Sequence, residues 1–336
     1  VSDVVQIDRN ELRKREPYLS ARALGAVLVP GEHIIDPWSA PLAYAHQGLA
    51  HKGRIMRRCR VTGGEFDGWR WTLHTTLGDV SAGVVINAAG NYGDLIEAIN
   101  EPPAFAITPR KGQFVVFDKP ASKLLHSIIL PVPTERTKGV VACRTAFGNL
   151  LVGPTAEDQK ERSRAEVDQA VLEQLIAKGV EMIPGLARHS VNAIYAGLRP
   201  ATQFKDYQIA VNRQRRWITA AGIRSTGLTA ALGIAQMIGR GFNETFGGMK
   251  DEEPIWTPVP NLAEDRPRQY LTQAGGDIVC HCELVTRGEI AAALEGPLPA
   301  GDLGGLKRRT RCMMGRCQGF YCGAKVAALA EGRIVP

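Results

Sequence analysis

Hydrophobic and polar positions alternate through residues 53–90 as they do in short strands, and the stretch closes on a continuous apolar run. The alternation is visible at 54–61 and at 69–74, and residues 84–90 then read V-V-I-N-A-A-G. Parallel strands buried on both faces give such runs, and their carboxyl ends deliver backbone to a bound nucleotide. The pattern therefore predicts strands over the first two segments and a buried parallel strand that ends at Gly90.

Further along the chain, stretches with a helical period alternate with short apolar segments set between Pro and Gly turns. Strands joined in this way beside helices indicate an α/β (α+β) fold. The predicted elements are strands over 113–118, 126–132 and 139–152, a helix over 157–178, a hairpin of 207–211 with 216–220, and a helix over 226–241.

A Pro- and charge-rich stretch without periodicity, residues 247–276, predicts a linker. One domain is expected over 1–246 and a smaller one over 277–336. No internal repeat or low-complexity tract interrupts either of them.

Composition describes an ordinary globular protein of 336 residues, 44% hydrophobic and 22% charged. No apolar run approaches the length of a membrane span, and the first residues lack the pattern of a signal peptide. The net charge of +7 is largely scattered and accompanies no nucleic-acid motif, which argues against a nucleic-acid partner. Cysteines kept as thiols point to the cytoplasm.

The second domain holds five of the seven cysteines. They are Cys280 and Cys282 in a C-x-C pair, followed by Cys312, Cys317 and Cys322. One close pair and one distant pair of thiolates can hold an iron–sulfur cluster or a zinc ion. A disulfide-stapled tail and free thiols in a core are the other interpretations.

Two details favour iron–sulfur over zinc. Zinc sites usually hold their cysteine pairs as C-x2-4-C knuckles, and C-x-C is tighter. The second group also lies among cations and glycines, whose charges and exposed N–H groups stabilise an anionic [2Fe-2S] centre. These residues are Lys307, Arg308, Arg309, Arg311, Gly315, Arg316 and Gly319.

The segments V-C-H-C-E-L-V-T-R-G-E-I and L-K-R-R-T-R-C-M-M-G-R-C-Q-G-F-Y-C, within residues 279–322, resemble the BFD-like [2Fe-2S] domain. That domain ends anaerobic glycerol-3-phosphate dehydrogenase large subunits and related amine and amino-acid dehydrogenases. The resemblance leaves Cys312 as a spare thiol, with an exchange of Cys312 for Cys317 as the open alternative. The implied ligands are Cys280, Cys282, Cys317 and Cys322.

Two helices are expected around these cysteines. Thr286 and Glu289 form the T-x-x-E pattern of a capping box, which predicts a helix running to Gly296. A last helix is expected from near Cys322 to Gly332, with its positive amino end toward an anionic cluster.

The first domain carries short segments that are weak singly and specific in their order. They are E-P at 16–17, V-P-G-E-H-I-I-D-P at 29–37, V-I-N-A-A-G-N-Y-G-D at 85–94, P-R-K-G-Q at 109–113, L-V-G-P-T at 151–155, A-G-L-R-P at 196–200 and A-A-G-I-R-S-T-G-L-T at 220–229. In this order they resemble FAD flavoproteins of the D-amino-acid-oxidase (glycerol-3-phosphate dehydrogenase-like) type. The resemblance implies a partial FAD-binding domain beside an antiparallel-sheet substrate domain.

The resemblance also places the flavin. The loop at 222–229, between a strand and a helix, would meet the isoalloxazine ring with its N–H groups and the helix dipole. Small residues at 88–90 would admit the ribose and pyrophosphate, and Val61 would contact the adenine end. The implied flavin contacts are Val61, Ala88, Ala89, Gly90, Gly222, Ile223, Thr226, Gly227 and Leu228.

Three side chains are candidates for the chemistry. Arg199 is expected to grip a carboxylate or phosphate with its planar fork, and Arg224 to face the ring or the substrate. His33 lies in the substrate-side segment 29–37 and is the favoured histidine. A surface salt bridge, a plain strand-to-helix turn and a structural histidine are the simpler alternatives.

The resembling flavoproteins open with a G-x-G-x-x-G turn that holds the FAD pyrophosphate, and this sequence contains none. That unit is therefore expected to have been removed, to come from another polypeptide, or to be lost together with independent FAD binding.

The predicted function is an FAD-dependent dehydrogenase of a small anionic, glycerol-3-phosphate-like substrate. It would pass electrons through the [2Fe-2S] cluster to a partner, a second flavoprotein or electron-accepting subunit, with at most peripheral membrane association. The alternatives are a non-catalytic [2Fe-2S] electron-transfer or scaffold subunit, an amino-acid, opine or imino-acid dehydrogenase, and a zinc module.

Overall fold

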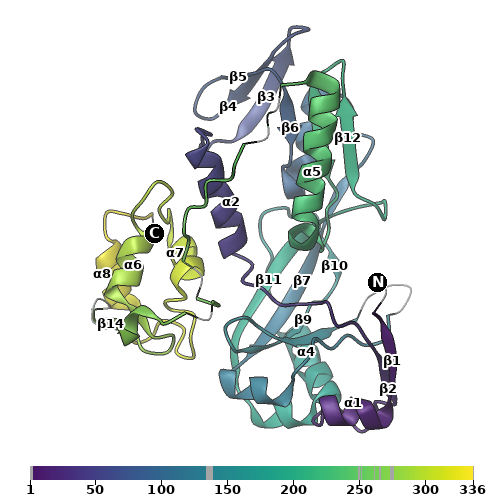
Figure 1. Cartoon of the computed structure of the whole chain (residues 1–336), viewed down its shortest axis with the longest axis vertical. Helices are drawn as coiled ribbons and strands as arrows, with labels where there is room; N and C mark the ends of the chain where they lie inside the picture. Colours follow the sequence, from purple (N-terminus) through teal and green to yellow (C-terminus); the bar gives the residue numbers. More distant parts are fainter. Residues whose placement is uncertain are drawn as a thin grey trace.

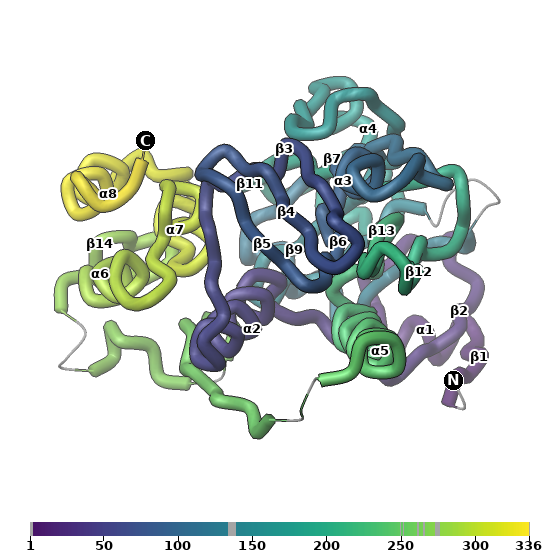
Figure 2. The backbone as a smooth tube through the Cα atoms, turned by 90° about the horizontal axis from the view of Figure 1, so that it is seen from above, coloured from purple at the N-terminus to yellow at the C-terminus, as the bar shows by residue number. Residues whose placement is uncertain are grey.

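The computed structural model describes residues 3–133, 139–248, 250, 252–260, 262–264, 266–272 and 276–335. Figure 1 shows an elongated body with a small C-terminal domain beside it. Seen from above in Figure 2, the C-terminal helices lie at one side, and α2 (Ser39–Ala50) lies between them and α5 (Gly227–Phe246). Two long strands, β7 (Ile107–Phe117) and β11 (Val191–Thr202), pair antiparallel and run through the body.

The lower part of the body is a five-stranded sheet covered by α4 (Gln169–Met182). Strand β7 pairs with β9, β10 and β11, and β9 pairs with β8. Apolar side chains such as Val115 and Leu150 pack with Leu175 of α4 in a buried core. The remaining elements are β8 (Val141–Arg144), β9 (Leu150–Gly153), β10 (Glu157–Asp158), η2 (Lys119–Leu124) and η3 (Pro184–Arg188).

The upper part is built on a sheet in the order β12-β13-β6, in which β6 and β13 are parallel. Trp71 and Trp217 are fully buried at its core, with ring centroids 4.9 Å apart. Helix α5 lies along this part (Figure 1). The other elements are β3 (Val61–Phe66), β4 (Trp71–Thr75), β5 (Val80–Ala82), β6 (Val85–Asn87), β12 (Gln208–Asn212), β13 (Trp217–Ala221), η1 (Gly90–Tyr92) and α3 (Gly93–Asn100).

The N-terminal segment joins the lower part. Strand β1 (Val5–Asp8) pairs with β2 (Gly25–Leu28), and α1 (Arg9–Arg15) lies between them. Glu16, 1% exposed, accepts the backbone N–H of His126 with both carboxylate oxygens. This buried contact ties the end of α1 to the segment after η2.

The C-terminal domain has its own core, in which Cys280, Cys312 and Cys322 are buried among apolar residues. Thr286 and Glu289 form the predicted capping box at the start of α6. The elements are η4 (Gln269–Leu271), β14 (Ile278–Cys280), β15 (Val285–Thr286), α6 (Arg287–Ala293), α7 (Leu303–Thr310) and α8 (Gly323–Ala330).

Several sequence predictions are confirmed. The mixed fold with antiparallel sheets is present, and β6 is the predicted parallel strand. The hairpin is β12 with β13, and the helix predicted over 226–241 is α5, which continues to Phe246. The last helix is α8.

Other predictions are wrong. The helix predicted from residue 157 begins only at Gln169, because Glu157 and Asp158 pair with β7 and the Asp168 carboxylate accepts the Val171 N–H as the helix cap. Residues 126–132 form no strand beyond a single bridge from Ile129 to Ala142.

The strand predicted over 54–61 is also wrong, since β3 begins only at Val61. Ile55 and Met56 remain about half exposed, at 45% and 49%, so no sheet covers them. Positions 249, 251, 261, 265 and 273–275 of the predicted linker lie outside the described residues. None of the helices in the described ranges combines the length and hydropathy needed to span a bilayer.

Candidate active site and metal centre

A cavity of about 290 Å³ opens where the ends of β6 and β13 meet the start of α5. Pro200 and an aliphatic face of α5 complete the lining. Ligand pockets usually span roughly 300–1,000 Å³, so this cavity suits a flat ring or one part of a dinucleotide. The predicted flavin contacts that line it are Ala88, Gly90, Gly222, Ile223 and Gly227.

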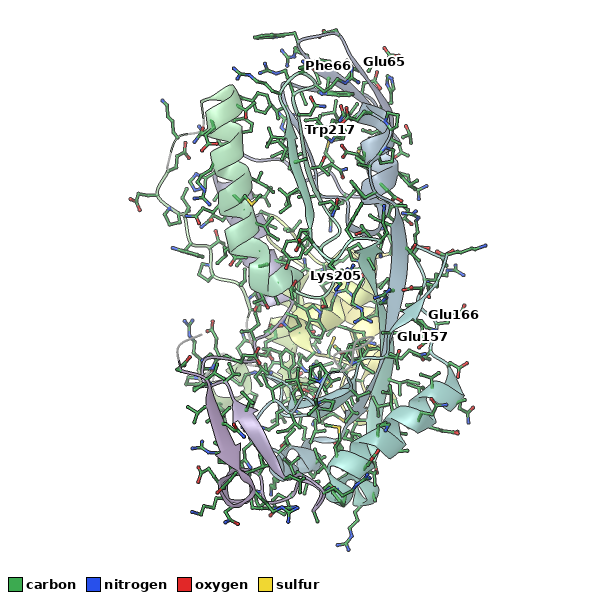
Figure 3. The ribbon with its side chains drawn as sticks, turned by 90° about the vertical axis from the view of Figure 1, so that its right-hand side faces the viewer. Glu65, Phe66, Glu157, Glu166, Lys205 and Trp217 are labelled. Carbon is green, nitrogen blue, oxygen red and sulfur yellow. The ribbon has the colours of Figure 1, made fainter. Side chains whose placement is uncertain are left out.

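The carboxylate of Glu97, on α3, holds together the strands that end at this cavity. It accepts hydrogen bonds from Asn87 Nδ2 at 2.9 Å, Trp217 Nε1 at 3.0 Å and Thr219 Oγ1 at 2.7 Å. Asn87 lies on β6 and the other two residues lie on β13; Figure 3 labels Trp217. Because a buried carboxylate needs such donors, the three bonds fix both strands to α3 and bring their ends to the cavity together.

Backbone geometry at the cavity depends on glycine. Gly222 has φ +67°, and a Cβ built on it would lie 3.1 Å from Thr202 Cγ2. Helix α5 starts at Gly227, and no side chain caps it. The hydroxyl of the N-cap residue, Thr226, bonds the Tyr207 hydroxyl instead. The first N–H groups of α5 therefore present the positive end of the helix dipole beside the cavity.

Arg199 lies on β11 immediately before Pro200, which lines the cavity. Its guanidinium donates to the Thr155 carbonyl at 2.7 Å, and no carboxylate of the described ranges pairs with it. Burial, and then the nearby Arg110, lower the pKa of Arg199. A Cβ on Gly112 would lie 3.1 Å from Arg199 Nη2, so the glycine makes room for this side chain.

Arg224 follows Ile223, another residue of the lining. Its Nη2 donates to the carbonyls of Thr202, at 3.2 Å, and Phe204. Its Nε is buried and has no partner within the described residues. Because a buried donor without an acceptor is costly, this nitrogen is a candidate for binding an anion.

Asp158, on β10, is the carboxylate whose charge interacts with these arginines, and Glu157 beside it pairs with Lys111 instead. Arg110 donates to its two carboxylate oxygens at 2.6 and 3.0 Å. The hydrogen bond from Arg110, aided by the charges of Arg110, Arg199 and Arg224, lowers the pKa of Asp158 against a smaller penalty for burial. Figure 3 labels the neighbouring Glu157 beside the long strands. Three guanidinium groups around one carboxylate leave positive charge for an anionic ligand.

The other predicted residues lie outside the lining. Ala89 and Thr226 precede the first turns of η1 and α5, and Leu228 is 38% exposed on α5. Val61 begins β3, and His33 is exposed in the segment before α2. The structure thus brings Ala89, Thr226 and Leu228 next to lining residues, but it does not bring Val61 or His33 into the cavity.

The four implied metal ligands form two adjacent thiol pairs, Cys280 with Cys322 and Cys282 with Cys317. Cys280 and Cys322 are buried, whereas Cys282 and Cys317 are half-buried. Within the described ranges no three or more His, Cys, Asp or Glu side chains are grouped to hold one metal ion. A [2Fe-2S] cluster offers two irons that each take two thiolates, so paired thiols suit it better than a single tetrahedral zinc.

Backbone N–H groups surround the half-buried outer pair, Cys282 and Cys317. The N–H groups of Tyr321, Gly319 and Phe320 bond the Cys317 sulfur and lower its pKa, although burial opposes the shift. The N–H of Cys317 is in turn bonded to the sulfur of Cys282. Such N–H groups stabilise the negative charge of an iron–sulfur centre.

The buried thiols of Cys322 and Cys312 have raised pKa values, so they lose their protons less readily. Burial, and then the adjacent Cys280, raise the pKa of Cys322 to about 11. Burial also raises the pKa of Cys312, which is fully buried in the domain core. Since metals bind thiolates, a cluster would replace the protons of its ligands. A Cβ built on Gly315 would overlap the Cβ of Cys282, so the loop closes tightly on the thiols and the site fits the cluster.

Glu283 holds the thiol loop against the body. Its carboxylate, 5% exposed, accepts from Arg311 at 3.1 Å and from Lys119 of η2 at 3.2 Å. The Arg311 guanidinium also lies 4.1 Å from the centroid of the Phe147 ring, in the β8–β9 turn. These contacts fix the position of the thiol pairs relative to the lower sheet.

A second contact joins the same two parts, because Arg316 Nε donates to Asp118 at 2.9 Å. Sequence reasoning missed Asp118, Asp158, Glu283 and Phe147. Only Glu283 gave a local signal, as the acidic residue directly after C-H-C; the roles of the others depend on contacts between distant segments.

Two family models match the chain. The one described as FAD dependent oxidoreductase matches residues 2–240, and the BFD-like [2Fe-2S] binding domain matches residues 278–331. Together they cover the cavity and all four implied ligands.

Known proteins resemble the chain over most of its length. Glycerol 3-phosphate dehydrogenase of Caloramator mitchellensis is 29% identical over 97% of this chain and 70% of its own length. One subunit of the anaerobic glycerol-3-phosphate dehydrogenase of Escherichia coli is 26% identical over 97% of this chain and 67% of its own. The solved L-alpha-glycerophosphate oxidase of Mycoplasma pneumoniae, with FAD bound, is 26% identical with a TM-score of 0.68, over 76% of this chain and 67% of that one.

Proposed function

The chain belongs to the family of FAD dependent oxidoreductases, and on that premise we propose that it is a dehydrogenase of a small anionic substrate resembling glycerol 3-phosphate. Its electrons would leave through the BFD-like [2Fe-2S] domain to a partner protein. The observation that carries the substrate class is the pair Arg199 and Arg224, each next to a residue of the cavity lining.

FAD, when bound, accepts a hydride equivalent and releases electrons singly. In this proposal the small residues Ala88, Gly90, Gly222 and Gly227 let the ring approach the backbone. The uncapped start of α5 supplies positive potential where negative charge develops. Among the described residues β6 pairs with β13 alone, so the backbone groups on its other edge would remain available.

Arg199 and Arg224 would bind the anionic end of the substrate. Both guanidinium groups are held by backbone carbonyls, so their forks are oriented before a ligand arrives. Asp158 and Arg110 would set the position of this arginine group without contacting the reacting atoms. His33 and Val61 lie outside the cavity lining, and their roles rest on the family resemblance alone.

Cys280, Cys282, Cys317 and Cys322 would hold the [2Fe-2S] cluster, with Cys312 as a core thiol. Two pairs of sulfurs and the N–H groups around Cys317 support this assignment. We place the body at 1–246, a linker at 247–276 and the cluster domain at 277–336, and we place the protein in the cytoplasm, where thiols stay reduced.

A second candidate is a non-catalytic [2Fe-2S] electron-transfer or scaffold subunit. It is favoured by the limited cavity and by α5, whose side chains Leu232 and Met237 are 65% and 48% exposed. Amino-acid, opine and imino-acid substrates also fit the arginines, since a carboxylate binds the same fork.

The absorbance spectrum of anaerobically purified protein separates these functions. Flavin bands together with iron–sulfur absorption, and bleaching by glycerol 3-phosphate, are expected for the dehydrogenase. Iron–sulfur absorption without flavin, even after incubation with FAD, would support the electron-transfer subunit. Bleaching by amino or imino acids alone would replace the substrate class, and a colourless zinc protein would contradict both functions.

A further inference from the structure

The two most exposed aromatic side chains of the described residues lie beside the cluster ligands. Phe320 is 83% exposed and Tyr321 is 81% exposed, and their rings meet edge to face at 5.1 Å. They stand between Cys317 and Cys322 in the chain. Large aromatic side chains left in water next to a functional centre are typical of a contact surface.

The backbone N–H groups of Phe320 and Tyr321 are hydrogen-bonded to Cys317. The N–H groups of Phe320 and Tyr321 bond the Cys317 sulfur, and Phe320 N–H also bonds the Cys317 carbonyl at 3.0 Å. A protein that covers the two rings would therefore lie against the half-buried side of the thiol pairs. The body, in contrast, contacts this domain through Glu283 and Arg316.

The chain on either side of the aromatic pair carries only positive charges. Residues 303–330 contain six Lys and Arg residues and no Asp or Glu. Arg316 precedes the aromatic pair but is bonded to Asp118 of the body, whereas Lys325 follows the pair on the first turn of α8. Lys325 forms no ion pair with any residue in the described ranges, so its charge is available to a partner.

We propose that Phe320 and Tyr321, with Lys325 beside them on α8, form the docking surface for an acidic one-electron acceptor protein. This inference rests on the proposed electron-transfer function. One electron would leave the reduced cluster and reduce the cofactor of the acceptor by one electron, with no bond made or broken. Two such transfers would complete each two-electron oxidation. The exposed rings give affinity, and the charge of Lys325 steers the acidic partner.

Zero-length cross-linking tests the contact directly. The full chain, with its cluster reconstituted anaerobically, is mixed with oxidised rubredoxin, a small acidic one-electron protein, and treated with a carbodiimide that joins carboxylates to lysine. We expect Lys325 to be the main linked lysine, and the yield to fall with added salt. Links spread over other lysines with Lys325 unmodified would overturn the proposal.

Variants give the second readout. The double variant Phe320→Ser with Tyr321→Ser should lower the Lys325 cross-link and the rate of cluster reoxidation by rubredoxin about tenfold or more, because buried aromatic anchors dominate such interfaces. Reoxidation by ferricyanide should stay unchanged. Trp256→Ser, which removes an aromatic residue that is 69% exposed in the linker, is the matched control and should change neither.

The remaining outcomes of these experiments would each relocate the docking surface, reassign the aromatic pair or refute the proposed function. If the double variant holds its cluster and reacts with rubredoxin at the wild-type rate, the docking surface is elsewhere. Loss of a wild-type dimer, or of binding to phosphatidylserine vesicles, in the double variant would assign the pair to a second copy or to a membrane and overturn the proposal. A wild-type chain that takes up no iron would instead refute the proposed function. If the double variant loses its cluster, Lys325→Glu replaces it and must lower the rubredoxin rate while sparing ferricyanide.

Discussion

Gly315 lies so close to Cys282 that a Cβ at position 315 would overlap the Cβ of the cysteine. Gly315→Ala should therefore push Cys282 away from the loop that carries Cys317. We expect the iron affinity to fall about tenfold or more, as it does when groups that orient metal ligands are disturbed. Iron bound per chain after anaerobic reconstitution, titrated against a chelator, measures the effect.

Gly304→Ala is the matched control for that substitution. Gly304 lies on α7, and its added Cβ would meet two exposed side chains, at Arg308 Nη1 (3.0 Å) and Asp302 Oδ1 (3.2 Å), and no cysteine. Iron binding should remain at the wild-type level. Equal iron affinity in the two variants would show that the tight loop at Gly315 does not shape the metal site.

Glu283 should stabilise the fold far more than the exposed charges around it. Glu283→Ala leaves Arg311, whose side chain is only 8% exposed, without its carboxylate, and should lower the free energy of unfolding by about 3 kcal/mol. Arg316→Ala removes a more exposed ion pair and should cost less than about 1 kcal/mol. Urea unfolding of both metal-free variants measures the difference. Similar costs would contradict the clamp assigned to Glu283.

The ion pair of Asp94 and Arg162 should make stability depend on pH. Burial opposes ionisation of Asp94, but hydrogen bonds from Arg162, at 2.6 and 2.9 Å, and from the Ile107 N–H lower its pKa below the ordinary 3.8. A depressed pKa gives stability that is full above the ordinary value and is lost as the pH falls through the lowered one.

Asp94→Asn tests this dependence. At pH 7 the variant should lose about 3 kcal/mol of unfolding free energy, because Arg162 is left partly buried and unpaired. The gap between wild type and variant should close as the pH falls below 3.8. A gap that stays constant from pH 7 to the acid limit of folding would contradict the assignment; Asp206→Asn, at an exposed carboxylate without a hydrogen bond or ion pair among the described residues, would provide the control.

Arg199 and Arg224 should govern substrate affinity. In FAD-loaded protein, Arg199→Gln or Arg224→Gln should raise KM for glycerol 3-phosphate about tenfold or more, since each would lose a charge-assisted hydrogen bond. Arg22→Gln, in an exposed ion pair with Glu181, is the control and should leave KM unchanged. If both active-site variants keep the wild-type KM, the anion is bound elsewhere.

The local patterns were readable from sequence. The capping box of Thr286 with Glu289 and the cysteine spacing each depend on residues within one segment or on paired segments of a known motif. Strand β6, which ends at Asn87 rather than at the predicted Gly90, and helix α5 were predicted for the same reason, and five of the implied flavin contacts meet at one cavity.

Contacts between segments that are distant in the chain could not be predicted from the sequence. Arg110 meets Asp158 only through the register of β10 on β7, and that pairing also removes the first part of the helix predicted from residue 157. Glu97 collects donors from β6 and β13, and nothing near Glu97 in the chain announces them. Tertiary pairing overrides local preference at these positions.

Metal and sulfide analysis tests the central claim most directly, because the electron path requires a [2Fe-2S] cluster on the C-terminal thiols. Protein prepared anaerobically should contain about two irons and two acid-labile sulfides per chain, and Cys317→Ser should lower both while Cys143→Ser leaves them unchanged. One zinc per chain, or neither iron nor sulfide in the wild-type protein, would contradict the account.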